Sequence, residues 1–157
     1  MKKIWLFFTS EVQLKKLLIE AYLLLAWARV LKAIPFSRVS PYLGSQMSET
    51  SFEIDPVNIK IVKQISHSIH IMSKYTFWES QCLVKAIASM RMLERRQIDS
   101  TLYLGTAKNE MGEMIAHAWL RSGPIYLTGA EEMGRFVVVC KFAKEPRKHE
   151  LSLEDPK

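Results

Sequence analysis

Cys82 is the residue whose position in the sequence best suits covalent chemistry. It follows Ser80 and Gln81 and opens a run with helical periodicity that extends to about Arg96, so we expect it at the second or third residue of a helix. Unpaired backbone N–H groups and the helix dipole favour a thiolate there. The same N–H groups can donate to an oxyanion formed on an attacked carbonyl. Free cysteine is also among the most buried residue types, so inert packing is the alternative.

His117 is the second candidate. It lies in the middle of Ala116-His117-Ala118-Trp119-Leu120, which alternates as a β-strand does. The alternation places His117 on one face with Ile115 and Trp119, so an imidazole occupies a largely apolar surface. A base that deprotonates a thiol needs such a rigid, partly desolvated position, with a third group that orients the ring. An ordinary core or sheet-surface histidine is the alternative.

The elements that must position these two residues are helices followed by strands. The predicted helices cover about residues 10–34, 56–75 and 81–96, with Ser10 and Ser80 as N-caps, and the predicted strands cover 101–105, 114–121, 125–128 and 135–143. This order, with short turns between the strands, indicates an α+β fold with an antiparallel sheet. We divide the chain into an N-terminal amphipathic helical segment (1–44), a domain (45–145) and a flexible tail (146–157), with a wrapping linker over 35–56.

The N-terminal segment carries seven Lys or Arg against two Glu. Its first apolar run, residues 4–8, is shorter than the roughly 7–15 residues of a signal peptide. Its longest uncharged stretch, residues 21–28, is far below the roughly 18–20 residues that span a bilayer. We therefore expect a cytoplasmic protein. The helix can pack on its own domain, dock a partner, or contact a membrane surface, and the last is the least favoured.

The composition excludes several classes of protein. The chain has 157 residues, of which 48% are hydrophobic, which is too apolar for a disordered chain. Two cysteines in a domain of this size exclude a disulfide scaffold and indicate a reducing compartment. Most of the basic excess lies in the N-terminal segment and not across the whole fold, which argues against a nucleic-acid partner. His67 and His70 lack further ligands at helical spacing, so we expect no metal and no cofactor.

Several segments around the two candidates resemble one family when they are taken together. They are Trp78-Glu79-Ser80-Gln81-Cys82-Leu83-Val84-Lys85-Ala86, Met92-Leu93-Glu94-Arg95-Arg96, Leu102-Tyr103-Leu104-Gly105 and Ala116-His117-Ala118-Trp119-Leu120. This set resembles the transglutaminase-like leader peptidases of lasso-peptide biosynthesis, which are similar to the C-terminal half of the microcin-processing protein of that pathway. The resemblance covers roughly residues 55–143, and the N-terminal helical region resembles the stand-alone form of the peptidase.

The resemblance implies a papain-like, transglutaminase-type fold, with Cys82 as nucleophile and His117 as general base and acid. The implied reaction hydrolyses one peptide bond of a ribosomally made precursor and frees the core peptide from its leader. A separate ATP-dependent cyclase then closes the macrolactam. The implied partners are the leader region of the lasso precursor and a small leader-recognition protein that presents it. The cyclase itself is a further possible partner.

The third member of the triad is where this sequence departs from the family. The resemblance places an acid about a dozen residues after the histidine, and Gly129 occupies that position. Glu131 is the nearest carboxylate and is our candidate, while Asp99, Glu110 or a neutral group could orient the ring instead. Trp78 and Gln81 flank the nucleophile and are expected to wall the cleft or supply an oxyanion donor, or else to serve packing and the helix start.

Two other functions remain open from the sequence. A transglutaminase-like acyltransferase would use Cys82 and His117 in the same way, with an amine in place of water as acceptor. A non-catalytic scaffold would bind the precursor peptide without turnover. The glycine at position 129 favours the scaffold, whereas the presence of both candidate residues argues against it.

Overall fold

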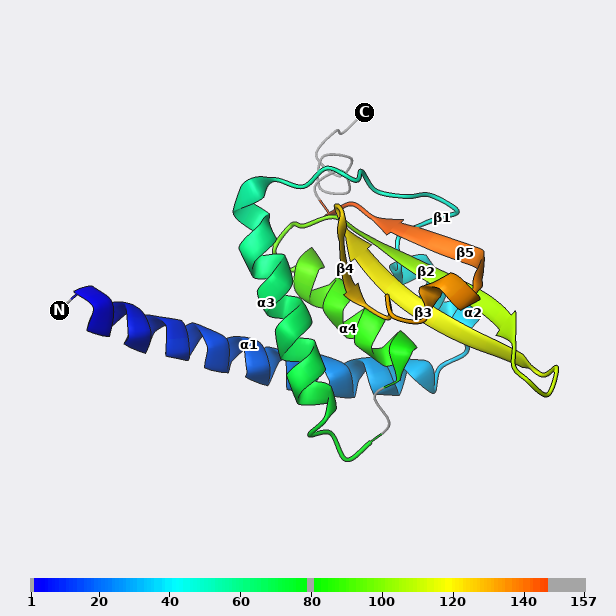
Figure 1. Cartoon of the computed structure of the whole chain (residues 1–157), viewed down its shortest axis with the longest axis horizontal. Helices are drawn as coiled ribbons and strands as arrows, with labels where there is room; N and C mark the ends of the chain where they lie inside the picture. Colours follow the sequence, from blue (N-terminus) through cyan, green and yellow to red (C-terminus); the bar gives the residue numbers. More distant parts are fainter. Residues whose placement is uncertain (1, 79–80, 147–157) are drawn as a thin grey trace.

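The computed structural model describes residues 2–78 and 81–146, and for residues 2–11 it describes the backbone alone. Four α-helices and a five-stranded sheet form the described part of the chain (Figure 1). The predicted α+β class with an antiparallel sheet is confirmed.

Helix α1 spans Lys2–Lys32 and is longer than the sequence predicted. Ser10 lies inside this helix and is not its N-cap, because no glycine or proline interrupts the chain before Pro35. The predicted apolar face is present in the second half of the helix, where Leu17, Ala21, Leu25 and Ala28 are all buried in the hydrophobic core. The first half extends away from the rest of the molecule (Figure 1).

The segment predicted as a linker contains three short elements. They are α2 (Phe36–Val39), the 3-10 helix η1 (Ser40–Tyr42) and the two-residue strand β1 (Ser45–Gln46). Gly44 allows β1 to reach the sheet, because its φ is +113° and a Cβ there would lie 2.1 Å from the carbonyl oxygen of Ala143. Only a glycine permits so close a backbone approach.

Helices α3 (Pro56–Ser73) and α4 (Cys82–Glu94) agree with the predicted helices to within two residues. The Asp55 side chain caps α3 by accepting from Val57 N, and Pro56 takes the first helical position, where its missing N–H costs nothing. Gln81 takes the N-cap position of α4. Ser80, which we predicted as that cap, lies outside the described residues.

The sheet has the strand order β1-β5-β2-β3-β4, and all pairs are antiparallel. Its longer strands are β2 (Ser100–Lys108), β3 (Met114–Ser122), β4 (Ile125–Thr128) and β5 (Val137–Lys144), with the 3-10 helix η2 (Met133–Arg135) between the last two. β3 pairs with β2 from Met114 to Arg121, whereas β4 pairs only with Leu120, Arg121 and Ser122.

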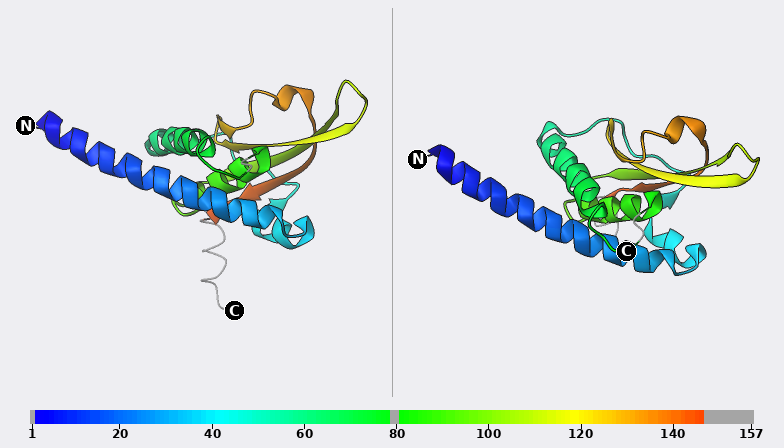
Figure 2. Two further views of the ribbon diagram at one scale, coloured as in Figure 1. Left: turned by 90° about the horizontal axis from the view of Figure 1, so that it is seen from below. Right: turned by 60° about the horizontal axis from the view of Figure 1, so that its bottom comes forward.

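The two faces of the sheet carry different layers. Helices α1 and α4 lie on one side and η2 lies on the other (Figure 2). Ala118 and Leu120 of β3 belong to the core that the helices cover, and so does Leu102 of β2. Because neighbouring residues of a strand point to opposite faces, Tyr103 and Trp119 lie on the side away from α1 and α4, where both are buried outside that core.

Within the described residues, no helix is both long enough and apolar enough to cross a membrane. The N-terminal segment instead contributes the second half of α1 to the common core, where it packs against α3 and α4.

A pair of leucine substitutions on α1 tests this packing. Leu25 is fully buried and Leu23 is 61% exposed, so Leu25→Ala should lower the free energy of unfolding by about 2–5 kcal/mol. Leu23→Ala should change it by less than about 0.5 kcal/mol. Urea denaturation followed by circular dichroism measures both. Equal effects of the two substitutions would show that α1 is not part of the folded core.

Candidate active site

Cys82 is the first residue of α4, one or two positions earlier than predicted. Its thiol is free and half-buried, and the side chain packs against the core on the helical side of the sheet. No side-chain hydrogen bond caps the helix at Gln81, and the first N–H groups of an α-helix have no partner within it. The start of α4 therefore offers backbone donors beside a thiol, which is the arrangement that an oxyanion site requires.

The segment before Cys82 is attached to α1. Lys32 Nζ donates to Gln81 Oε1 over 3.3 Å, and the Trp78 ring packs on Tyr22 with 5.2 Å between centroids. The Trp78 indole N–H is buried and has no acceptor within the described part of the chain. These contacts connect α1 to Trp78 and to Gln81, the residue before Cys82. The predicted roles of Trp78 and Gln81 in the cleft stay predictions.

His117 lies on β3 directly opposite Gly105 of β2. Its ring packs against Phe136, with 4.9 Å between centroids, and against Trp119, with 5.8 Å. The imidazole Nε2 is 2.8 Å from the carbonyl oxygen of Gly129. Since a carbonyl can only accept, Nε2 carries the hydrogen and Nδ1 is the basic nitrogen of the neutral ring.

Gly129 thus orients the histidine through its backbone. This is the position at which the resemblance places an acid, and a neutral orienting group was one of the alternatives left open by the sequence. Gly129 has φ +75°, and a Cβ there would lie 2.5 Å from Ala118 O and 3.0 Å from His117 Nε2. A side chain at this position would displace the contact that holds the ring.

Glu131, our candidate for the acidic member, is exposed. No hydrogen bond joins its carboxylate to His117, whose ring partner in the described structure is the Gly129 carbonyl. The role of Glu131 as the orienting group therefore remains a prediction without a contact to support it.

The neighbours of Cys82 and His117 place the two side chains on different faces of the sheet. Cys82 packs with the core under α4, whereas the ring of His117 stacks with Trp119 and Phe136 on the other face of the sheet. The reason is the register of β3: Ala118 points toward the helices, so its neighbour His117 points away. No hydrogen bond connects the two candidate side chains among the described residues.

Arg121 is the main feature of this region that the sequence analysis missed. Its side chain is completely buried, and its guanidinium donates to the carbonyl oxygens of Thr50, Ser51 and Gly123 over 3.0, 3.1 and 2.8 Å. It also lies 3.7 Å from the centre of the Phe52 ring. Strand alternation was a usable signal, because it places Arg121 on the same face as His117 and Trp119.

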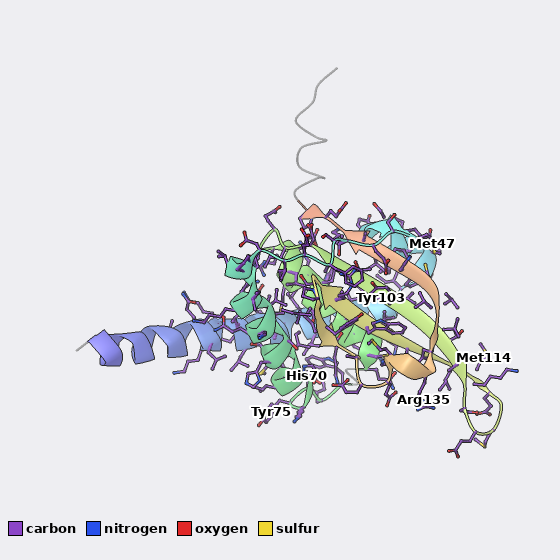
Figure 3. All side chains as sticks on the ribbon, turned by 45° about the horizontal axis from the view of Figure 1, so that its top comes forward. Met47, His70, Tyr75, Tyr103, Met114 and Arg135 are labelled. Carbon is purple, nitrogen blue, oxygen red and sulfur yellow. The ribbon has the colours of Figure 1, made fainter. Side chains whose placement is uncertain are left out.

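Tyr103 and Glu49 extend this buried network. Arg121 Nε donates to Tyr103 Oη over 3.0 Å, and Tyr103 Oη donates to Glu49 Oε1 over 2.6 Å. Tyr103 is labelled in Figure 3, on the sheet. Burial, with the hydrogen bond to Glu49, raises the pKa of Tyr103 to about 12. The same hydrogen bond is the main cause of a lowered pKa at Glu49.

The network supports the histidine through a row of rings. Tyr103 stacks on Trp119 with 5.6 Å between centroids and 12° between planes, and Trp119 in turn meets His117. Gly105 leaves room for this row, since a Cβ there would lie 2.8 Å from the Trp119 ring. The imidazole is therefore fixed from two sides, by stacked rings and by the Gly129 carbonyl.

The second cysteine and two arginines of the segments that resemble the peptidase family also have partners in the structure. The Cys140 thiol is half-buried and accepts from Gln46 Nε2 over 3.6 Å. Arg95 and Arg96 both pair with Glu20 of α1. Among the described residues, no group of three or more His, Cys, Asp or Glu is placed to hold a metal ion.

Comparison with known families identifies the fold. Residues 22–141 match the transglutaminase-like superfamily. The chain belongs to that superfamily. No curated protein and no solved structure matches it. The matched range begins inside α1, so the core residues Leu25 and Ala28 lie within it, whereas Leu17 and Ala21 precede it. Membership is compatible with a cysteine peptidase or an acyltransferase, both of which use a cysteine thiol for acyl transfer.

The pH dependence of stability tests the Tyr103 network. The pKa of Tyr103 is raised from 10.0 to about 12 in the folded protein, so the unfolded chain loses the phenolic proton first as pH rises. The stabilisation is complete below about pH 10 and is lost by about pH 12. The wild type should thus be more stable than Tyr103→Phe near neutral pH, with the difference shrinking through this range. Urea unfolding at a series of pH values measures it, and a constant difference would contradict the network.

Substitution at Gly129 tests the backbone orientation of the ring. Gly129→Asp supplies the acid that the lasso leader peptidases would place here, but the φ of +75° and the 2.5 Å approach to Ala118 O oppose any side chain. We expect a loss of stability of about 1–3 kcal/mol and no gain of activity. Gly134→Asp is the matched control, since nothing lies within 4 Å of a Cβ there. A variant at position 129 that is as stable as the wild type and more active would refute this account.

Proposed function

We propose that this transglutaminase-like protein is a cysteine peptidase that removes the leader peptide from a ribosomally made lasso-peptide precursor. The observation that carries the proposal is the superfamily match over residues 22–141 combined with Cys82 at the uncapped start of α4. The sequence segments around Cys82 and His117 that resemble the lasso leader peptidases supply the choice of substrate.

The proposed reaction is acyl transfer to the Cys82 sulfur. The thiolate attacks the scissile carbonyl carbon, and backbone N–H groups at the start of α4 hold the oxyanion. His117 takes the thiol proton and delivers it to the leaving amine as the amide C–N bond breaks. Water then attacks the thioester, with His117 as base, and releases the leader carboxylate and the free thiol.

This reaction requires a movement, because the imidazole and the thiol lie on opposite faces of β3. A general base acts within hydrogen-bond reach of the proton that it takes. β4 pairs with β3 only from Leu120 onward, so the stretch that carries His117 is held on that edge by the Gly129 carbonyl. We propose that binding of the precursor, presented by a small leader-recognition protein, brings His117 and Cys82 within reach of each other.

The proposed setting is the cytoplasm, with the lasso cyclase as a possible further partner. An acyltransferase that passes the acyl group to an amine would use the same residues, and superfamily membership is equally compatible with it. A non-catalytic scaffold is the other alternative, and it is supported by one observation: no hydrogen bond joins Cys82 to His117 among the described residues.

Mass spectrometry of a lasso precursor incubated with the protein tests the proposal. The assay is run with and without the leader-recognition protein, and the wild type should give a single cleavage when that protein is present. Cys82→Ala should give no product, and His117→Ala should slow the reaction by about 10²–10⁴-fold. Cys140→Ala is the matched thiol control and should cleave normally.

The three functions give different outcomes in this assay. A product joined to an added amine, and not to water, would assign the protein as an acyltransferase. Intact precursor under every condition, with tight binding retained, would overturn the peptidase and support the scaffold. Normal cleavage by Cys82→Ala would remove the proposed nucleophile.

A further inference from the structure

A groove of about 540 Å³ lies between the C-terminal part of α1, the α2–η1 segment and α4. Its size falls within the range of about 300–1,000 Å³ found for sites that bind small ligands and short segments. Its apolar lining is formed by Trp27, Leu31, Ile34, Val39, Leu43, Ile87 and Met90. Of these, Trp27 and Ile34 stay 42% and 37% exposed, so apolar surface remains open to solvent.

The charged side chains of the groove are mainly basic. Arg38, Arg91 and Lys144 line it, against the single acidic residue Glu94. Glu94 pairs with both Arg91 and Lys144, over 2.6 and 3.2 Å. Arg38 forms no ion pair within the part of the chain that the structure describes. Two positive charges are therefore in excess, one of them on a side chain with no anionic partner.

The groove is close to the candidate nucleophile. Ile87 is on the same helix as Cys82, five residues later, which corresponds to about 7–8 Å along the axis. Leu31 precedes Lys32, whose ammonium group donates to Gln81 beside Cys82. A peptide that lies along the groove therefore has one end near the start of α4.

We propose that this groove binds an acidic, amphipathic peptide segment, namely part of the leader of the precursor. Its apolar side chains would cover Trp27 and Ile34, and a carboxylate would pair with Arg38. An amphipathic segment laid into an apolar groove is a recurring mode of peptide recognition. The identity of the segment as a leader rests on the proposed function, whereas its chemistry rests on the groove alone.

Charge argues against a second copy of this chain as the occupant. A two-fold dimer through this face would place the same patch on both sides of the interface. Arg38 would then face a surface with the same positive excess, and like charges across an interface are unfavourable. An anionic peptide satisfies both the apolar lining and the free guanidinium.

Fluorescence anisotropy with the full chain carrying Cys82→Ala tests the groove without any turnover. The probe is a labelled amphipathic peptide of about 15 residues, roughly four helical turns, with Leu on one face and Glu on the other. A second peptide carries Lys in place of every Glu. The acidic peptide should bind and the Lys peptide should not, and the affinity should fall with added salt.

Three further variants locate the binding. Arg38→Glu should weaken binding of the acidic peptide by about tenfold or more, since it reverses a charge-assisted contact. Trp27→Ala should weaken it as well, with an unchanged circular dichroism spectrum. Lys60→Glu, an exposed basic residue of α3 outside the groove, is the charge-matched control and should bind normally.

The outcomes separate this inference from the proposed function. Equal binding of the Glu and Lys peptides, or unchanged affinity in Arg38→Glu, would overturn the groove as a site for acidic peptides. A concentration-dependent dimer that Arg38→Glu abolishes would assign the groove to a second copy and would also overturn it. Because cleavage is measured separately, a failure here leaves the Cys82 assay intact, and a failed cleavage leaves the binding result intact.

Discussion

The buried guanidinium of Arg121 is the interaction on which the outer face of the sheet depends. A cation without solvent is costly unless all of its donors are paired. The Arg121 guanidinium donates to the carbonyl oxygens of Thr50 and Ser51, and these hydrogen bonds hold the chain before α3 against the sheet. Tyr103 is then held by hydrogen bonds to Arg121 and Glu49. Trp119 stacks on Tyr103 and on His117, so the His117 ring packs against a side chain that is itself held in place.

The alternation of β3 is the second constraint, and it decides what the site can do. Ala118 and Leu120 pack in the core that the helices cover, and this packing fixes which side of β3 faces the helices. His117 consequently belongs to the outer face while Cys82 belongs to the inner one. The proposed chemistry needs the imidazole and the thiol to come within hydrogen-bond reach of each other.

Much of the fold followed from local patterns in the sequence. Pro56 after a capping Asp fixed the start of α3, and the alternation after Asp99 gave the strands close to their observed bounds. β1 was missed because two residues cannot show a period, and the start of α1 was missed because Ser10 resembles a cap within a continuous helix.

The site was harder to predict for a physical reason. Alternation tells which residues share a face, as it did for His117 and Trp119, but not which face the helices cover. The sequence favoured the carboxylate of Glu131 as the orienting group and left a neutral group only as an unspecified alternative. Every residue has a backbone carbonyl, so the sequence does not indicate which one accepts a hydrogen bond from the His117 ring. The contact with Gly129 is visible only in the structure.

That carbonyl has a consequence for how the protein can vary. A carboxylate that orients a histidine is lost by a single change of codon and is neutralised in acid. The Gly129 oxygen belongs to the main chain, so it has no proton to gain in the physiological range and is retained as long as position 129 stays glycine. Natural variation should therefore keep glycine at this position, because the contact depends on the backbone and on the space that a side chain would fill.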